Sequence, residues 1–199
     1  TLTFGSVSLG NVTKEESLIT GSMYASTTKA YNSYGLVTNT TDPRGATSTF
    51  AYDSYNFYIS TSTDTLGHVS DQLYDYATGK VKRNVDANGA IHQYIYDSVG
   101  RPIEEDQSDQ ITPATLVTKT TYAYTDNVFP SKSQMVSYLN VATTTDNHTY
   151  FDGLGRKIQE RSEGETGNYS VKDTVYNALG LLSEESLPYF ATSSQWSSA

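Results

Sequence analysis

The chain has 199 residues, a formal net charge of −9 and only 18% charged residues. An acidic surface without a cluster of Lys or Arg repels phosphate backbones, so we predict no nucleic-acid binding, and no apolar run reaches the roughly 18–20 residues that span a bilayer. The 17 Tyr and the many Ser and Thr favour strands, and the two Met argue against a helical bundle. We therefore predict an all-β protein.

The opening segment, residues 1–30, shows no regular pattern, and we interpret it as a divergent repeat or a junction. It begins at Thr1 without a visible signal peptide, which is typical of an excised or processed segment. The chain contains no Cys, which excludes disulfides and thiolate metal sites. Stability must therefore come from repeated packing.

Two interlocked sets of motifs run through residues 31–106. The first is Asp-x-x-Gly, which recurs every 22 residues at Asp42 and Gly45, Asp64 and Gly67, and Asp86 and Gly89. The second is a Tyr-Asp or Tyr-Asn pair followed by Gly or Asn, spaced by 21 or 22 residues, at Tyr31, Gly35, Tyr52, Asp53, Tyr74, Asp75, Gly79, Tyr96, Asp97 and Gly100. Two such sets in step indicate a repeat protein.

Each repeat predicts one antiparallel β-hairpin of about 22 residues. Aromatic residues at alternate positions, such as Tyr94 and Tyr96, share one face of a strand. An Asp can bond the main chain two residues on, and Gly supplies a positive φ, so each motif reverses the chain. Because an isolated hairpin is marginally stable in water, the hairpins must lie side by side and bury a shared face.

The later part of the chain keeps this pattern more loosely. Residues 107–149 stretch the spacing, and Pro113 and Pro130 indicate degenerate repeats with longer loops or edge positions. Clear copies return over residues 150–190, at Phe151, Asp152, Gly155 and Arg156 and again at Tyr176 and Gly180. The Ser-rich tail, residues 191–199, is expected to fray.

The phrases that begin at Tyr96, Phe151 and Tyr176 resemble the Tyr-Asp (YD) repeats of the RHS family, whose motif is Tyr-Asp-x-x-Gly-Arg followed by an apolar residue. The resemblance covers roughly residues 31–106 and 150–187, and Arg101 and Arg156 supply the Arg of the motif. The closing phrase, residues 184–190, also resembles the large bacterial toxin-complex and SpvB-like relatives.

The resemblance implies a continuous, curled sheet of hairpins, which is a segment of an RHS-type β-shell. In full-length relatives such a shell encloses a toxin polypeptide, and in teneurins a comparable barrel serves cell adhesion. The implied role is structural and non-catalytic, without cofactor or metal, in a larger bacterial protein that is secreted or at the cell surface. The implied partners are the remaining RHS repeats of a larger polypeptide or a companion shell subunit, and the enclosed toxin polypeptide. The alternative is a cell-surface adhesion or glycan-binding module built on the same repeats.

We interpret the motif residues as structural anchors of the turns. These are Tyr31, Gly35, Asp42, Gly45, Tyr52, Asp53, Asp64, Gly67, Tyr74, Asp75, Gly79, Asp86, Gly89, Tyr96, Asp97, Gly100, Arg101, Phe151, Asp152, Gly155, Arg156, Tyr176 and Gly180.

Metal binding is the first competing interpretation. His68 and His92 fall near the second turn of successive repeats and would form a zinc pair only if the strands brought them together. The segment from Asn84 through Asp86 resembles a calcium loop, but its twelfth position is Ile95, where a bidentate Glu is needed. We therefore interpret these residues as parts of turns and predict no metal site.

Catalysis is the second competing interpretation of these residues. Glu104 and Glu105 are adjacent on a strand, so they point to opposite faces and cannot form a glycosidase pair. The segment from Asp42 to Gly45 echoes the Asp-Pro-x-Gly of a self-cleaving aspartyl protease in family relatives, but it falls on the 22-residue spacing of the turns. No Gly-x-Ser-x-Gly elbow is present, and we predict no enzymatic activity.

The aromatic stripes leave two interpretations open. Exposed rings, with Tyr94 and Trp196 as examples, would stack on sugars in a glycan-binding module. The preferred interpretation is that the rings pack against the face of the sheet, because they sit at positions fixed by the repeat.

Overall fold

The computed structural model describes residues 10–109, 112, 115–140 and 142–197. The chain divides into two compact units, Thr1–His92 and Gln93–Ala199, which are described in turn. The order of strands in the sheet follows the order in the chain from β1 to β15, and neighbouring strands are hydrogen-bonded.

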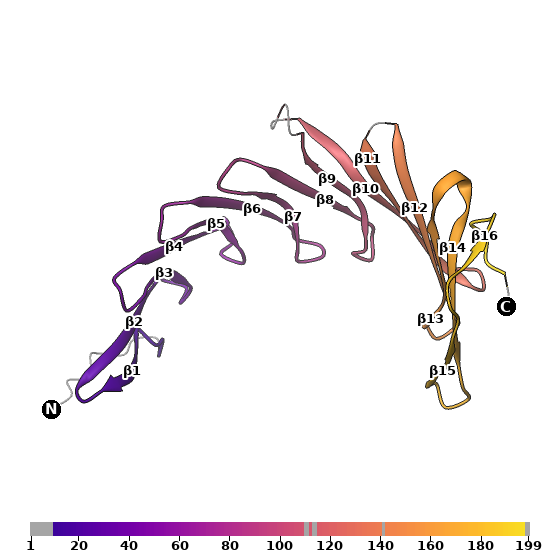
Figure 1. Ribbon diagram of the computed structural model, residues 1–199. Helices are drawn as coiled ribbons and strands as arrows, with labels where there is room; N and C mark the ends of the chain where they lie inside the picture. Colours follow the sequence, from indigo (N-terminus) through magenta and orange to yellow (C-terminus); the bar gives the residue numbers. More distant parts are fainter. Residues whose placement is uncertain (1–9, 110–111, 113–114, 141, 198–199) are drawn as a thin grey trace. The chain divides into compact units, whose positions relative to one another are not determined.

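The first unit is a series of antiparallel hairpins laid edge to edge (Figure 1). Its strands are β1 (Lys14–Thr20), β2 (Met23–Tyr31), β3 (Val37–Thr41), β4 (Thr47–Tyr52), β5 (Ile59–Thr63), β6 (Val69–Asp75) and β7 (Lys80–Val85). The next strand, β8 (Ile91–Tyr96), contains the division between the units. In β4 exposed and half-buried residues alternate, so that Phe50 and Tyr52 share the half-buried face.

The second unit includes strands of 10 residues, longer than any strand in the described part of the first unit. It contains β9 (Pro102–Ser108), β10 (Leu116–Thr125), β11 (Ser131–Asn140), β12 (Thr143–Phe151), β13 (Lys157–Glu163), a 3-10 turn η1 (Glu165–Gly167), β14 (Tyr169–Tyr176), β15 (Leu182–Glu185) and β16 (Tyr189–Ala191). The 10 residues of each of β10 and β11 explain why the sequence motifs are spaced more widely here.

One edge of β14 pairs with two short strands in succession. β15 pairs with the C-terminal part of β14, where Thr174 faces Glu185, and β16 pairs with the N-terminal part, where Val171 faces Tyr189. The main-chain N–H of Ser186 donates to the Asp173 carbonyl (3.0 Å), so pairing continues between the two strands. The chain then leaves this edge as the C-terminal tail.

The two units differ in burial. Among the described residues of the first unit none is buried, whereas the second unit buries Val171, Tyr150 and several polar side chains. The described residues contain no α-helix, and the predicted all-β fold of antiparallel hairpins in one unclosed sheet is confirmed. In this part of the chain no helix has the length and apolar character needed to cross a bilayer.

Candidate functional site

The Tyr-Asp motif forms a compact turn that its Asp and Gly stabilise together. Oδ1 of Asp97 accepts hydrogen bonds from the main-chain N–H groups of Val99 (3.0 Å) and Arg101 (2.8 Å). The N–H of Gly100 donates to the Asp97 carbonyl (3.0 Å), and its φ of +83° is a left-handed conformation that suits glycine. The same three bonds close the turns that start at Asn32, Asp42, Asp64, Asp86, Asp152 and Asn177.

Two turns depart from this geometry. The Asp53 turn is one residue longer, because the N–H of Asp53 donates to the carbonyl of Tyr58 (2.9 Å). Asn56 takes the left-handed position there, with φ of +57°, as the one non-glycine residue of the described chain with positive φ. In the other turn the N–H of Gly79 donates to the carbonyl of Asp75 (2.8 Å), four residues earlier.

In four of the repeats the hydroxyl group of the Tyr connects its turn to the segment that follows the preceding left-handed Gly. Tyr52 donates to the main-chain carbonyl of Val37 (2.9 Å), and Tyr124 donates to that of Pro102 (2.9 Å). Each acceptor lies two residues after a left-handed Gly. The same bond joins Tyr31 to Val12 (2.6 Å), two residues after Gly10, and Tyr176 to Lys157 (3.1 Å). Sequence analysis missed this connection, because its acceptor is a main-chain carbonyl, which carries no residue-type signal.

The Arg of the motif connects its own turn to the next one. Nε of Arg101 donates to Oδ2 of Asp97 (2.8 Å), and the guanidinium carbon lies 4.1 Å from the ring centroid of Tyr124. Arg156 repeats both contacts, with Asp152 (2.7 Å) and with the Tyr176 ring (4.4 Å). The main-chain N–H and the guanidinium of Arg156 hold the pKa of Asp152 below its ordinary value. The Arg therefore combines an ion pair with a cation–π contact.

In the Asp53 turn aromatic residues make the corresponding contacts. Tyr58, at the position that Arg occupies in other turns, stacks on the Tyr74 ring with centroids 4.3 Å apart and planes 13° from parallel. Oδ2 of Asp53 accepts a bond from the Tyr76 hydroxyl (2.7 Å). This bond to a carboxylate raises the pKa of Tyr76 to about 12. In this turn the Tyr58 ring thus takes the place of the guanidinium over the next Tyr, and the Tyr76 hydroxyl takes its place at the Asp carboxylate.

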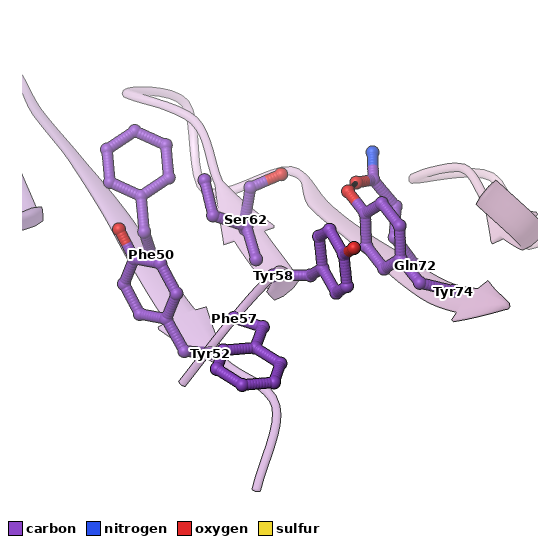
Figure 2. A pocket seen from close by; sticks show the side chains of 8 residues that line it. Phe50, Tyr52, Phe57, Tyr58, Ser62, Gln72 and Tyr74 are labelled. Carbon is purple, nitrogen blue, oxygen red and sulfur yellow. Dashed lines mark hydrogen bonds between the residues drawn. The ribbon is translucent and has the colours of Figure 1, made fainter. Parts of the chain in front are cut away.

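A groove of about 390 Å³ opens beside this aromatic turn on the half-buried face of β4, β5 and β6. Figure 2 shows the rings of Phe50 and Tyr52, Phe57 and Tyr58, and Tyr74 arranged around it, with Ser62 and Gln72 as polar neighbours. The Phe57 ring is 70% exposed. The groove is therefore a part of the first unit where several aromatic side chains gather and one ring face is open to a ligand.

The second unit gathers polar side chains beneath the C-terminal tail. Tyr150 donates to the carbonyl of Ser194 (2.6 Å), Arg161 donates to that of Ser193 (2.6 Å), and Gln159 donates to that of Ser197 (3.0 Å). Residues 193–197 thus lie along β12 and β13, held through their main chain, which differs from the expected fraying. The spacing of the motifs carried no signal for these contacts.

The structure places the other sequence candidates in turns or in paired strands. His68 bonds Asp64 within its own turn through Nδ1 (2.8 Å), and His92 lies in β8. Glu105 accepts a bond from the Tyr122 hydroxyl (3.0 Å), and Asp42 closes a turn of the common geometry. Among the residues that the structure describes, no three His, Asp or Glu side chains are placed to hold a metal ion.

Comparisons with known proteins concern the fold. The model of a domain of unknown function, DUF6443, matches residues 124–198, and no curated protein sequence matches the chain. A crystal structure of TcdB2-TccC3 superimposes with a TM-score of 0.68 at 15% identity, over 89% of this chain and 12% of that one. The structure of TcdB2-TccC3-Cdc42 gives 0.68 at 12% identity, over 89% and 14%, and that of TcdB2-TccC3 without the hypervariable C-terminal region gives 0.68 at 12%, over 92% and 14%.

This likeness shows a shared fold. The resemblance to the RHS proteins of toxin complexes, predicted from the Tyr-Asp motifs, is confirmed at the level of the fold. The chain spans only 12–14% of the length of these solved chains.

Proposed function

We propose that the chain is a non-catalytic segment of a β-shell wall that encloses or presents a toxin polypeptide. The observation that carries the proposal is the connection between successive turns: the hydroxyl groups of Tyr52 and Tyr124 donate to the preceding turn, and the guanidinium groups of Arg101 and Arg156 lie over the Tyr ring of the next one. Such contacts stabilise an arrayed sheet, where each repeat is held mainly by its neighbours. The shared fold with TcdB2-TccC3 supports the same role.

The remaining parts of the proposal follow from the resemblance. The wall would be completed by further RHS repeats of a larger polypeptide or by a companion shell subunit, in a bacterial protein that is secreted or at the cell surface. The motif residues would act as structural anchors, and the regular repeats of residues 31–106 and 150–190 would flank the more degenerate part, residues 107–149.

Limited proteolysis of the complete polypeptide that contains this chain tests the proposal. Peptide mapping should find one segment outside the repeats that trypsin cleaves slowly in the native protein and rapidly once Gly100→Val and Gly155→Val have loosened the wall. Equal cleavage of every segment outside the repeats, before and after these substitutions, would overturn enclosure. Hydrolysis of peptide, ester or glycoside substrates by the purified chain would overturn the non-catalytic assignment.

The groove of Figure 2 favours a second candidate function, glycan binding in an adhesion module. The ring of Phe57, which is 70% exposed in this groove, is available to stack on a sugar, and a stacked ring contributes about 1 kcal/mol. A glycan array should then give a signal that is lost in Phe57→Ala and kept in Tyr34→Ala, a change at an exposed tyrosine of another turn. A blank array with the unmodified chain would exclude this candidate.

A further inference from the structure

Exposed aromatic rings gather at the Asp53 turn of the first unit. Tyr55 lies within this turn and is 65% exposed, and Tyr76, in the next Tyr-Asp turn of the chain, is 49% exposed. Their ring centroids are 5.3 Å apart with the planes at 83°, and the exposed Phe57 ring lies 6.2 Å from that of Tyr55. The two tyrosines therefore form a nearly perpendicular pair of rings that is open to solvent.

A carboxylate without a cation lies beside this pair. Oδ2 of Asp53 accepts the Tyr76 hydroxyl (2.7 Å), and Oδ1 accepts the main-chain N–H of Phe57 (2.9 Å). None of the ion pairs among the described residues involves Asp53, and these residues include every Lys, Arg and His of the chain. A phenol donates a hydrogen bond but brings no positive charge, so the charge of Asp53 is left without a counter-ion.

The Asp152 turn of the second unit shows what such a carboxylate binds. Its Oδ2 accepts two bonds from the Arg156 guanidinium, from Nε (2.7 Å) and from Nη2 (2.6 Å), and the guanidinium carbon lies 4.4 Å from the ring centroid of Tyr176. Within the described part of the chain, Oδ2 of Asp53 accepts one side-chain bond, from Tyr76. Because a carboxylate oxygen can accept two bonds, Asp53 can take a further N–H donor.

The same combination of rings and carboxylate indicates the ligand. An aromatic face attracts a cation that lies within about 6 Å of the ring centroid, and a net charge of −9 favours cationic partners. We propose that Tyr55, Tyr76 and Asp53 bind an arginine side chain of a partner polypeptide. Arginine suits the site better than lysine, because a planar guanidinium can pair with a carboxylate and lie on a ring at once, as that of Arg156 does.

An NMR titration of the full isotope-labelled chain tests the site. The probe is the peptide acetyl-Gly-Gly-Arg-Gly-Gly-amide at millimolar concentrations, because a single exposed cation binds weakly. The amide signals of Tyr55, Phe57 and Tyr76 should shift in a saturable way. The same peptide with citrulline, which is planar but uncharged, should bind at least tenfold more weakly, and the peptide with lysine should bind several-fold more weakly.

Two variants and a matched control test the assigned residues. Asp53→Asn should weaken binding at least fivefold and keep the turn, since Asn side chains close the turns at Asn32 and Asn177. Tyr55→Ala should weaken binding at least threefold. Tyr34→Ala changes an exposed tyrosine at the same place in the Asn32 turn and should bind like the unmodified chain.

Three outcomes would overturn the proposal. Equal affinity for the arginine and citrulline peptides would remove the cation, and an unchanged affinity in Asp53→Asn would remove the carboxylate. Equal losses in Tyr34→Ala and Tyr55→Ala would show that the peptide binds exposed rings without a defined site. Identifying the partner with the enclosed polypeptide rests on the proposed function, whereas binding of the peptide does not. Proteolysis of the complete polypeptide and this titration can therefore fail independently.

Discussion

The two units build the same kind of hairpin sheet but cover it differently. In the described part of the first unit no residue is buried, and aromatic rings such as Phe50 and Tyr74 half-cover one face. In the second unit residues 193–197 lie on the sheet and bond the fully buried Arg161, and Val171 is fully buried as well. A sheet that is only half-covered on one face gains little from burial, so its repeats depend more on turns and on bonds between neighbours.

The turns show the same contrast on a smaller scale. In the Asp97 and Asp152 turns a guanidinium pairs with the Asp and covers the next Tyr. In the Asp53 turn Tyr58 covers Tyr74, and Tyr76 bonds the Asp. In these three turns the position after the turn therefore holds a flat group that stacks on the next Tyr, either an Arg or an aromatic residue.

The largest difference between the units should appear in their apolar residues. Val171→Ala, at a fully buried position, should lower the free energy of unfolding by about 2 kcal/mol, since the surrounding strands cannot close the space left behind. Val69→Ala, at an exposed position in β6, should change it by less than about 0.5 kcal/mol. Urea titrations followed by circular dichroism measure both, and equal losses would show that the units do not differ in burial.

The glycine of a turn should matter more than its exposed neighbour. Gly100→Val should cost more than about 1 kcal/mol, because a β-branched residue is strained at φ of +83°. Ser98→Val places the same side chain in the same turn at an exposed position and should cost less. If the two variants have the same urea midpoint, left-handed backbone at Gly100 does not limit stability.

The contrast between the turns also shows what the sequence could reveal. The Asp-x-x-Gly spacing predicts a turn because both contributions, the Asp97 bonds and the Gly100 backbone, lie within five residues of chain. The bond from Tyr124 to Pro102 spans 22 residues, and its acceptor is a main-chain carbonyl, which any residue provides. Likewise, the tail binds Arg161 through its main chain, so its sequence gave no sign that it would lie on the sheet. The all-β architecture could therefore be predicted from the sequence. The contacts that join repeats could not, because they depend on the register in which neighbouring strands pair.

Salt should separate the two kinds of turn. Tyr58→Leu removes a stacked pair and should cost about 0.5–1.5 kcal/mol at any ionic strength, because stacking carries no net charge. Arg101→Leu removes an ion pair with Asp97, so its effect on the urea midpoint should shrink between about 0.05 and 1 M NaCl. Parallel titrations at the two salt concentrations measure this. A salt dependence shared by both variants would mean that the two turns are not stabilised by different chemistry.

The smallest effects should appear in the titration of two tyrosines, one from each unit. A hydrogen bond to Asp53 is the main cause that raises the pKa of Tyr76 to about 12, whereas burial, followed by the bond to Glu105, raises that of Tyr122 to about 12. The fold therefore favours the protonated phenols, a stabilisation that is complete below pH about 10 and lost as the pH rises through about 12.

Removing the carboxylates should affect these two tyrosines unequally. Asp53→Asn should lower the pKa of Tyr76 substantially, because the dominant cause disappears. Glu105→Gln should lower the pKa of Tyr122 less, because burial remains. Ultraviolet titration of tyrosinate formation, with Tyr76→Phe and Tyr122→Phe to assign each step, measures both. If the pKa of Tyr122 falls more in Glu105→Gln than the pKa of Tyr76 falls in Asp53→Asn, the assignment of causes is wrong. Burial would then contribute no more to the pKa of Tyr122 than to that of Tyr76.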